Sequence, residues 1–241
     1  MRGYLILDLD GTILDDNKNV YREFLEVLPR IRRKYRIIIA SGRAKFSVEK
    51  YLKEMDLPEF YVSFEGAYIV WDGKIILRKP FTDDYQKYIE SNFGNFALVK
   101  FYENGVKPND RFFKEFSHYL KRWGAEMFWE GSDVFKYVIA TRSKDIIGDL
   151  PGTVFVYKRR DDIFYDIAPD TTKAEGLKIL MEKFDILPQE CVAFGDYYND
   201  IGIFKLCGFS VAVPRAPEDV KSFADMVAQP WDPKVLEILG V

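Results

Sequence analysis

The chain has 241 residues, a length that suits one large domain or a core domain with an inserted unit. Hydrophobic residues make up 48% of the chain and charged residues 30%, which is enough for a buried core beneath a polar surface. The formal net charge of −3 gives no reason to expect a nucleic acid as the main partner.

The cysteines and the hydropathy pattern indicate the cellular compartment in which we expect the protein. We interpret Cys191 and Cys207, both in apolar surroundings, as small core residues in a reducing compartment rather than as a disulfide or a metal site. No apolar run reaches membrane-spanning length, and the N-terminus lacks the charged-then-apolar order of a signal peptide. We therefore expect a cytoplasmic protein without a membrane partner.

The first predicted strand is followed by two aspartates. Residues 4–7 form an apolar run that is typical of a strand buried on both faces of a parallel sheet. Asp8 and Asp10 point to the same side because strand side chains alternate, and they lie at the edge where open α/β sheets place ligands. Gly11 allows a sharp turn, and Thr12 offers a hydroxyl. An ordinary acidic turn after a strand explains the same residues.

The second predicted strand leads into a candidate anion site. Residues 36–40 form this strand, and Ser41, Gly42 and Arg43 connect it to a helical pattern. Helix N-termini attract anions, so a hydroxyl, a flexible backbone and a cation here favour anion binding. A serine cap beside a glycine turn is the alternative. A third strand and a hairpin are expected next, over residues 60–64, 67–71 and 74–77.

The pattern changes after Pro80 to hairpins with helices between them, which describes a small α+β unit. Helices are expected over residues 82–93 and 110–123 and after Ser143, and strands over residues 96–102, 125–130, 134–140, 153–158 and 163–168. We interpret residues 79–166 as an inserted cap domain and residues 1–78 and 167–241 as the core.

The alternation of strands and helices resumes after Pro169. Lys173 lies in the first turn of a helix expected to run to residue 184, where a cation is unfavourable unless an external anion compensates it. A solvated lysine is the simpler interpretation of this residue alone. A buried strand over residues 191–194 then leads to Asp196 and Asp200, which are four residues apart and can face the same way.

Together these residues predict one site and the kind of ligands that it binds. Each lies at the same end of its own element, so we expect them to converge in one crevice. The single histidine, His118, is expected on the polar side of its helix, which leaves acid–base chemistry to carboxylates. A carboxylate cluster suits a hard, oxygen-loving ion, so Mg²⁺ is the expected cofactor. Ser41 and Lys173 are then expected to hold a phosphate beside the metal.

The motifs resemble those of the haloacid dehalogenase (HAD) superfamily. The resemblance lies in the order and spacing of four motifs across essentially the whole chain: Asp8-Leu9-Asp10-Gly11-Thr12, Ser41-Gly42-Arg43, Lys173, and Gly195-Asp196 with Asn199-Asp200. The position of the insert resembles the subclass with a type-IIB cap, which includes Cof-like sugar phosphatases, archaeal phosphoglycolate phosphatases and sucrose-phosphate phosphatases. The resemblance implies a Rossmann-like doubly wound core with an inserted α+β cap.

The resemblance also implies residue roles in a phosphatase that acts on a small phosphorylated metabolite. Asp8 is expected to form an aspartyl phosphate, and Asp10 to act as general acid and base. Phosphate binding is assigned to Thr12, Ser41, Gly42, Arg43 and Lys173. Mg²⁺ binding is assigned to Asp8, the Asp10 backbone carbonyl and Asp196, with Asn199 and Asp200 nearby as direct or water-mediated supports.

Several alternatives stay open at this point. A phosphotransferase or mutase is chemically close to a phosphatase, and a phospho-aspartate regulatory module is a more distant possibility. Glu65 stands where family members often carry Asn, and Arg215 where they commonly carry Asn, so both are candidate specificity residues or a different surface pairing. Basic residues 158–160 suit an anionic substrate such as phosphoglycolate or belong to an exposed turn. The substrate and the oligomeric state are left undetermined.

Overall fold

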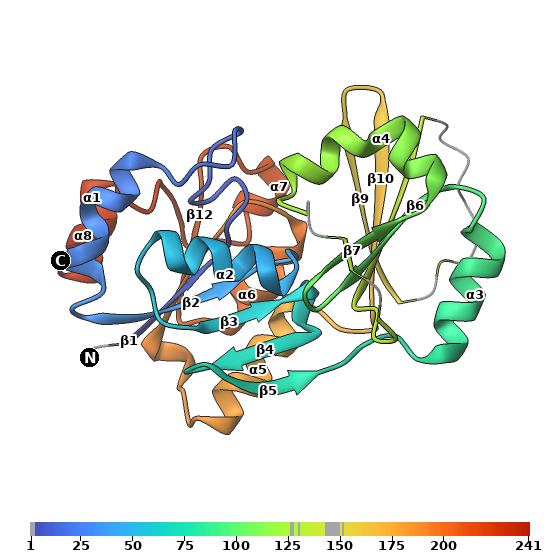
Figure 1. The fold of residues 1–241 in the computed structure, drawn as a ribbon. Coiled ribbons are helices and arrows are strands. Elements are labelled where there is room, and N and C mark those ends of the chain that lie inside the picture. The colour runs from blue at the N-terminus through green and yellow to red at the C-terminus, as the bar shows by residue number, and fades with distance from the viewer. Residues whose placement is uncertain (1–2, 126–127, 130, 143–149, 151) are drawn as a thin grey trace.

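The chain forms two β-sheets with helices packed around them (Figure 1). The structure is a computed structural model, and it describes residues 3–125, 128–129, 131–142, 150 and 152–241. The expected strand over residues 125–130 falls partly outside these residues, and the expected helix after Ser143 falls almost wholly outside them. Both therefore stay predictions.

The larger sheet belongs to the core. Within the described residues it has eight strands in the order β13-β12-β11-β1-β2-β3-β4-β5. Neighbouring strands from β13 to β3 are parallel, whereas β4 and β5 continue the sheet as an antiparallel hairpin. The strands are β1 (Gly3–Leu7), β2 (Tyr35–Ala40), β3 (Phe60–Ser63), β4 (Tyr68–Trp71), β5 (Lys74–Arg78), β11 (Cys191–Gly195), β12 (Phe209–Ala212) and β13 (Met226–Val227).

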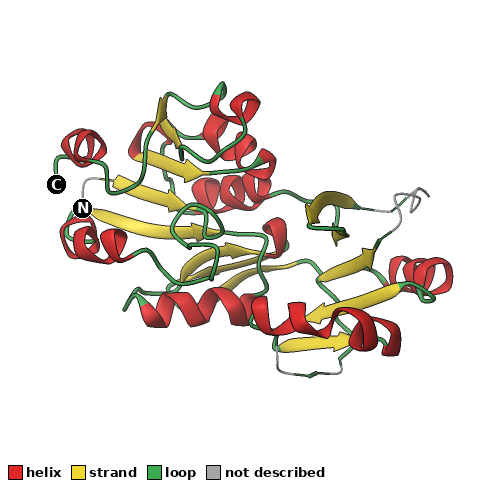
Figure 2. Ribbon diagram, turned by 90° about the horizontal axis from the view of Figure 1, so that it is seen from above, coloured by secondary structure: helices red, strands yellow, loops and turns green. Residues whose placement is uncertain are grey.

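Helices cover both faces of this sheet (Figure 2). Side chains alternate along β1, so Leu5 and Leu7 pack with α1, α2 and α8, whereas Ile6 packs with α5, α6 and α7. This arrangement confirms the predicted doubly wound α/β core. The helices are α1 (Arg22–Ile31), α2 (Lys45–Glu54), α5 (Lys173–Lys183), α6 (Ile201–Leu206), α7 (Glu218–Lys221) and α8 (Pro233–Leu239), with short 3₁₀ turns at Phe64–Gly66, Pro188–Glu190 and Tyr198–Asp200.

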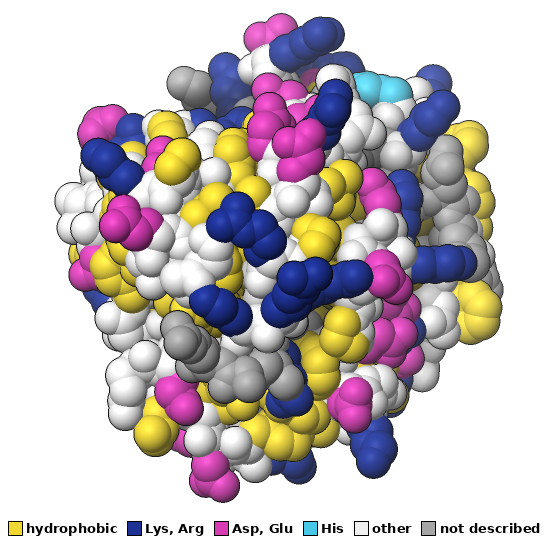
Figure 3. All heavy atoms as spheres, turned by 90° about the vertical axis from the view of Figure 1, so that its left-hand side faces the viewer, with side chains coloured by type: hydrophobic (Ala, Val, Ile, Leu, Met, Phe, Trp, Pro, Cys, Tyr) yellow, Lys and Arg dark blue, Asp and Glu magenta, His cyan; other side chains and the backbone are white. Residues whose placement is uncertain are grey.

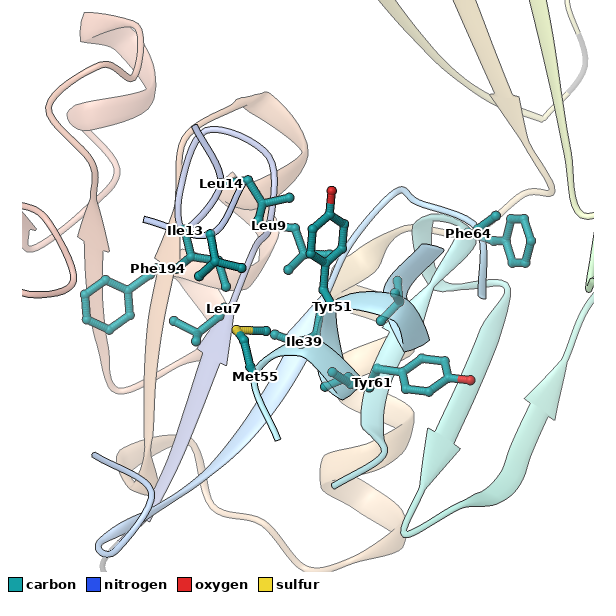
Figure 4. Close-up of a cluster of buried hydrophobic side chains, with 14 of the residues drawn as sticks. Leu7, Leu9, Ile13, Leu14, Ile39, Tyr51, Met55, Tyr61, Phe64 and Phe194 are labelled. Atoms are coloured by element: carbon teal, nitrogen blue, oxygen red, sulfur yellow. The ribbon is translucent and has the colours of Figure 1, made fainter. Parts of the chain in front are cut away.

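Aliphatic and aromatic side chains fill the space between the sheet and α2 (Figure 4). Leu7, Ile39 and Tyr61 come from adjacent strands of the sheet and belong to the same buried cluster as Tyr51 and Met55. All five are at most 3% exposed. Burial of this apolar surface fixes the strand ends from which the polar residues project.

The smaller sheet belongs to the inserted segment. Its order is β7-β6-β8-β10-β9, and every neighbouring pair is antiparallel. The inserted α+β unit is thereby confirmed as a fold class, while the domain boundaries at residues 79 and 166 stay a prediction. Its elements are β6 (Ala97–Tyr102), β7 (Gly105–Pro108), β8 (Lys136–Thr141), β9 (Thr153–Arg159), β10 (Asp162–Ala168), α3 (Asp83–Phe93) and α4 (Asp110–Arg122).

The prediction of this unit missed strand β7. Gly105–Pro108 pairs antiparallel with β6, and Val106 also bridges to Phe128. A four-residue strand that begins with Gly and ends with Pro carries little local β propensity, so its pairing partner decides its structure.

Arg32 and Arg36, two basic residues near the end of α1, make contacts of different kinds. Arg32 lies at the surface and pairs with Asp56 (3.1 Å), whereas the guanidinium of Arg36 lies over the rings of Phe60 and Trp71 at 4.7 and 5.0 Å. Figure 3 views the side of the molecule where α1 and α8 lie, and it shows basic, acidic and hydrophobic side chains on this face.

Candidate active site

The aspartates after β1 lie at the carboxyl edge of the core sheet. The backbone N–H of Asp8 donates to Phe194 O (3.1 Å), which continues the β1–β11 pairing by one residue and fixes the Asp8 backbone. Asp8 is 4% exposed, and its Oδ1 accepts a hydrogen bond from Lys173 Nζ at 2.6 Å. Burial raises the pKa of the Asp8 carboxyl well above its usual value, and Lys173 opposes this effect.

A cluster of carboxylates surrounds Lys173. Oxygens of Asp8, Asp196 and Asp200 all lie within 4.8 Å of one another. Lys173 Nζ also donates to Asp200 Oδ1 (2.8 Å), while Asp200 Oδ2 accepts the backbone N–H groups of Asp196 (3.0 Å) and Tyr197 (3.1 Å). Asp200 thus fixes the loop that presents Asp196.

These residues fit a divalent cation. Burial and the neighbouring Asp200 raise the pKa of Asp196 to about 7, although Lys173 opposes them. Three carboxylates against one lysine leave excess negative charge that a hard cation with oxygen ligands would neutralise. Gly11 is needed for this approach, because a Cβ at Gly11 would lie 2.0 Å from Asp196 Oδ2.

The other two predicted metal residues make different contacts. The Asn199 side-chain nitrogen donates to Glu65 Oε1 (3.0 Å) and Oε2 (3.2 Å). The Asp10 carboxylate forms ion pairs with two cations: Arg43 Nε lies 2.6 Å from Oδ2 and Arg43 Nη2 2.8 Å from Oδ1, and Lys18 also contacts Oδ1. The expected roles of Asn199 and of the Asp10 carbonyl toward a metal stay predictions.

Arg43 and Lys18 set the charge of Asp10. Burial of Asp10 would raise its pKa, but the two cations outweigh this effect and hold the pKa of Asp10 well below its usual range. The paired carboxylate is therefore ionised over the physiological pH range. It can accept a proton in this arrangement, and it can donate one only after it has taken one up.

Four of the five predicted phosphate-binding residues line one pocket, and Thr12 is not among its lining residues. Ser41 (1% exposed), Gly42 and Arg43 line this pocket together with Asp8 and Lys173. Thr12 is fully buried nearby in the chain, and among the described residues its hydroxyl has no hydrogen-bond partner. The pocket has a volume of about 470 Å³, which suits a small-molecule site.

Residues from the inserted segment complete this pocket. Of the three basic residues that the sequence left open as substrate contacts, Lys158 and Arg159 line it, whereas Arg160 is not among its lining residues. The open candidates Glu65 and Arg215 also line it. Sequence reasoning missed Lys18 and Lys136, because neither belongs to a motif. Lys136 is the single charged residue in the otherwise apolar predicted strand over residues 134–140, and that isolated cation is the available signal. The inserted segment also contributes apolar lining residues, including Phe101, Trp123, Val138, Phe155 and Tyr157.

The geometry agrees with a comparison of the whole sequence with known families. Residues 5–232 match the haloacid dehalogenase-like hydrolase family. The chain belongs to this family. The predicted family and the prediction of a hydrolytic enzyme are thereby confirmed.

Individual relatives extend over nearly the full chain. The Bacillus subtilis protein YkrA is 25% identical over 241 residues, covering 95% of this chain and 92% of YkrA. A phosphoglycolate phosphatase of Archaeoglobus fulgidus is 24% identical over 243 residues, covering 98% of this chain and 96% of the relative. The solved HAD subclass IIB sugar phosphatase BT4131 superposes with a TM-score of 0.77 at 21% identity, covering 99% of both chains, which shows a shared fold.

Among the described residues, no helix has the length and apolar character to cross a membrane.

Proposed function

We propose that this hydrolase is a Mg²⁺-dependent phosphatase of the cytoplasm that cleaves a small phosphorylated metabolite through an aspartyl phosphate on Asp8. The observation that supports it is the pairing of Lys173 with both Asp8 (2.6 Å) and Asp200 (2.8 Å) beside Asp196, in a pocket that Ser41 also lines. This set combines a nucleophile, a cation-binding cluster and donors for phosphoryl oxygens.

Mg²⁺ fits the carboxylate cluster. Asp8, Asp196 and the backbone carbonyl of Asp10 would hold it, and Asp200 and Asn199 would support these ligands from behind. When bound, Mg²⁺ supplies charge neutralisation between Asp8 and the negatively charged phosphoryl group.

The chain's own residues carry both half-reactions. A carboxylate oxygen of Asp8 attacks phosphorus, an acyl phosphate forms, and the ester P–O bond breaks as the leaving oxygen takes a proton. Water then attacks the acyl phosphate, releases inorganic phosphate and restores Asp8. Ser41, the Gly42 N–H and Lys173 bind the phosphoryl oxygens and stabilise charge that develops on them. The buried hydroxyl of Thr12, which has no hydrogen-bond partner within the described part of the chain, is a further candidate donor to these oxygens.

Asp10 moves the protons in this scheme. The ion pairs with Arg43 and Lys18 keep it ionised between turnovers, so it must take up a proton before it can protonate the leaving oxygen in the first half-reaction, and it then accepts a proton from the attacking water in the second. Binding of a phosphoryl group beside Arg43 would weaken the hold of the guanidinium on Asp10, because both anions compete for the same donors. Asp10 would then exchange protons with the leaving oxygen and with water.

The pocket limits the class of substrate. Its volume of about 470 Å³ exceeds the needs of inorganic phosphate, and its apolar lining residues and the cations Lys158 and Arg159 would contact the leaving group. The relatives that act on phosphoglycolate and on sugar phosphates place both classes in the test panel.

Phosphate release from this panel tests the proposal. We expect Mg²⁺-dependent release that a chelator stops and that Asp8→Asn lowers by at least about 10⁴-fold, since the nucleophile is lost. Circular dichroism of the variant checks that its fold is intact. Release that survives in Asp8→Asn would contradict the proposal. A phospho-Asp8 that persists for minutes would instead indicate a regulatory module, and transfer to an added sugar in preference to water would indicate a phosphotransferase.

A further inference from the structure

Glu65 lies against the backbone of the phosphate-binding loop. It belongs to the 3₁₀ turn after β3, has a φ of 55° and is 4% exposed. A Cβ at Gly42 would lie 1.9 Å from Glu65 Oε1, so the carboxylate occupies the space that any larger residue at Gly42 would need. Both oxygens of Glu65 accept hydrogen bonds from Asn199, at 3.0 and 3.2 Å. Glu65 therefore joins the loop at Gly42 to the loop that carries Asp196 and Asp200.

Lys136 reaches the same glycine from the inserted segment. It is the first residue of β8, and its side chain is 10% exposed. Its Nζ donates to Gly42 O at 3.3 Å and forms an ion pair with Asp166 of β10. A buried ammonium is costly unless it is paired, so these contacts define where the side chain can lie.

The carbonyl that Lys136 contacts belongs to the peptide group between Gly42 and Arg43. The N–H of the same peptide group, on Arg43, donates to Ser41 Oγ at 3.3 Å. Because a peptide group is planar, contacts at its oxygen and at its nitrogen together fix its orientation. The Ser41 oxygen that accepts this hydrogen bond keeps its own proton for a bound anion.

We propose that Glu65 and Lys136 are a pair of positioning residues that hold Gly42 from the core and from the cap, and so fix the Ser41–Arg43 loop for phosphoryl binding. The inference rests on the proposed function, because it takes the bound anion to be the substrate's phosphoryl group. Neither residue needs to touch the reacting atoms. Glu65 connects the loop to the cation-binding cluster, and Lys136 connects it to the second sheet.

The charged groups around Glu65 agree with the proposed joint role of Glu65 and Lys136. Burial raises the pKa of the Glu65 carboxyl, while Lys173 and Lys136 lower it. The core cation and the cap cation thus both stabilise the carboxylate at this position.

The first test uses Lys136 variants and requires no turnover. Hydrogen exchange of peptides that cover residues 41–47 is measured in Lys136→Met, in Lys136→Arg and in Asp133→Asn. The last is a matched control, because Asp133 pairs with Arg78 (2.9 Å) and connects cap to core away from Gly42. We expect about tenfold faster exchange in Lys136→Met, little change in Lys136→Arg and none in Asp133→Asn. Equal exchange in Lys136→Met and the wild type would overturn the inference.

A second variant removes the concern that an unpaired Asp166 simply unfolds the cap. Lys136→Met combined with Asp166→Asn leaves no lone buried charge, so its exchange change at residues 41–47 should match that of Lys136→Met. Restored wild-type exchange in this double variant would overturn the inference, because the effect would then come from Asp166.

Measuring the affinity for phosphate distinguishes a positioning role of Glu65 and Lys136 from a role in stability alone. With inorganic phosphate as a competitive inhibitor, Lys136→Met and Glu65→Gln should each raise Ki and KM by about tenfold, and Lys136→Arg should restore most of the affinity. The combined Glu65→Gln and Lys136→Met variant should lose less than the product of the single losses, because the residues act on one loop. Multiplicative losses would contradict a shared role. The phosphatase proposal itself fails separately, through the Asp8→Asn assay, whereas the exchange measurement does not depend on it.

Discussion

Asp196 lies where its negative charge is unfavourable in the folded chain. Burial and Asp200 raise its pKa to about 7, above the value of about 3.9 for an unfolded aspartate. The folded state therefore binds more protons than the unfolded state between these two values. The stability that this residue contributes is fully present below about pH 4 and is lost as the pH rises through about 7. A bound cation would reverse this trend, because it favours the ionised carboxylate.

We expect the melting temperature without divalent cations to fall as the pH rises from about 5 to about 8, and added Mg²⁺ to raise it more at the higher pH. At about 100 times its Kd the ion would add roughly 2.7 kcal/mol to the free energy of unfolding. Scanning calorimetry with Mg²⁺ or a chelator measures both effects. Asp196→Asn should weaken the pH dependence and the Mg²⁺ response together, and a variant that kept the full response would count against Asp196 as a ligand.

The sequence predicts residues of this site when they follow the ends of buried strands. Asp8, Ser41 and Asp196 are predicted this way, because the carboxyl ends of parallel strands meet at one edge, and in the structure all three line one pocket. Lys18 and Lys136 could not be found by the same reasoning. Each reaches the pocket from a different loop or sheet, and only the three-dimensional arrangement brings it to Asp10 or to Gly42.

Helix α5 places Lys173 through a defined N-terminus. The hydroxyl of Thr172 accepts a hydrogen bond from the backbone N–H of Glu175 at 3.2 Å, which fixes where the helix begins. Lys173 is the first helical residue, and it is held against the dipole by Asp8 and Asp200. The start of α5 and the position of the ammonium are therefore linked.

Two threonine caps allow this link to be tested. Thr82 caps α3 in the inserted segment in the same way, accepting from Tyr85 N at 3.4 Å. Thr172→Ala and Thr82→Ala should each lower the free energy of unfolding by about 1 kcal/mol, measured by urea denaturation. Only Thr172→Ala should also lower kcat/KM, by up to about 100-fold if the ammonium moves by about 1 Å. Equal kinetics in the two variants would show that the cap does not position Lys173.

Local sequence signals predicted whole elements to different degrees. Continuous apolar runs predicted β1, β2 and β11, and Asp72-Gly73 predicted the β4–β5 hairpin, because each signal lies within the element itself. Strand β7 depends on its pairing with β6 and so has no comparable signal. The pairing of β9 and β10 into the second sheet likewise depends on β8, which lies outside that hairpin.

At the scale of the whole molecule, an aromatic contact joins the two sheets. Phe135 precedes β8 and is fully buried between two aromatic rings of the core. Its ring stacks on Phe64 at 5.2 Å and meets Tyr68 edge-on at 5.5 Å. Since Phe135 is adjacent to Lys136, the same contact that anchors the cap also places the lysine near Gly42. In the arrangement proposed above, the position of the cap and the geometry of the Ser41–Arg43 loop are thereby coupled.

Removal of this ring should separate the cap from the core without unfolding either. Phe164 serves as the matched residue, because it is equally buried but packs against Tyr119 and Tyr157 of the inserted segment. Phe135→Ala and Phe164→Ala should each cost about 3–5 kcal/mol of stability, from lost burial and the cavity left behind. Below the unfolding transition, only Phe135→Ala should increase the radius of gyration in small-angle X-ray scattering and raise KM, because only its contact spans the interface. An unchanged radius in Phe135→Ala would mean that polar contacts such as that between Arg78 and Glu103 (3.1 Å) suffice to hold the cap in place.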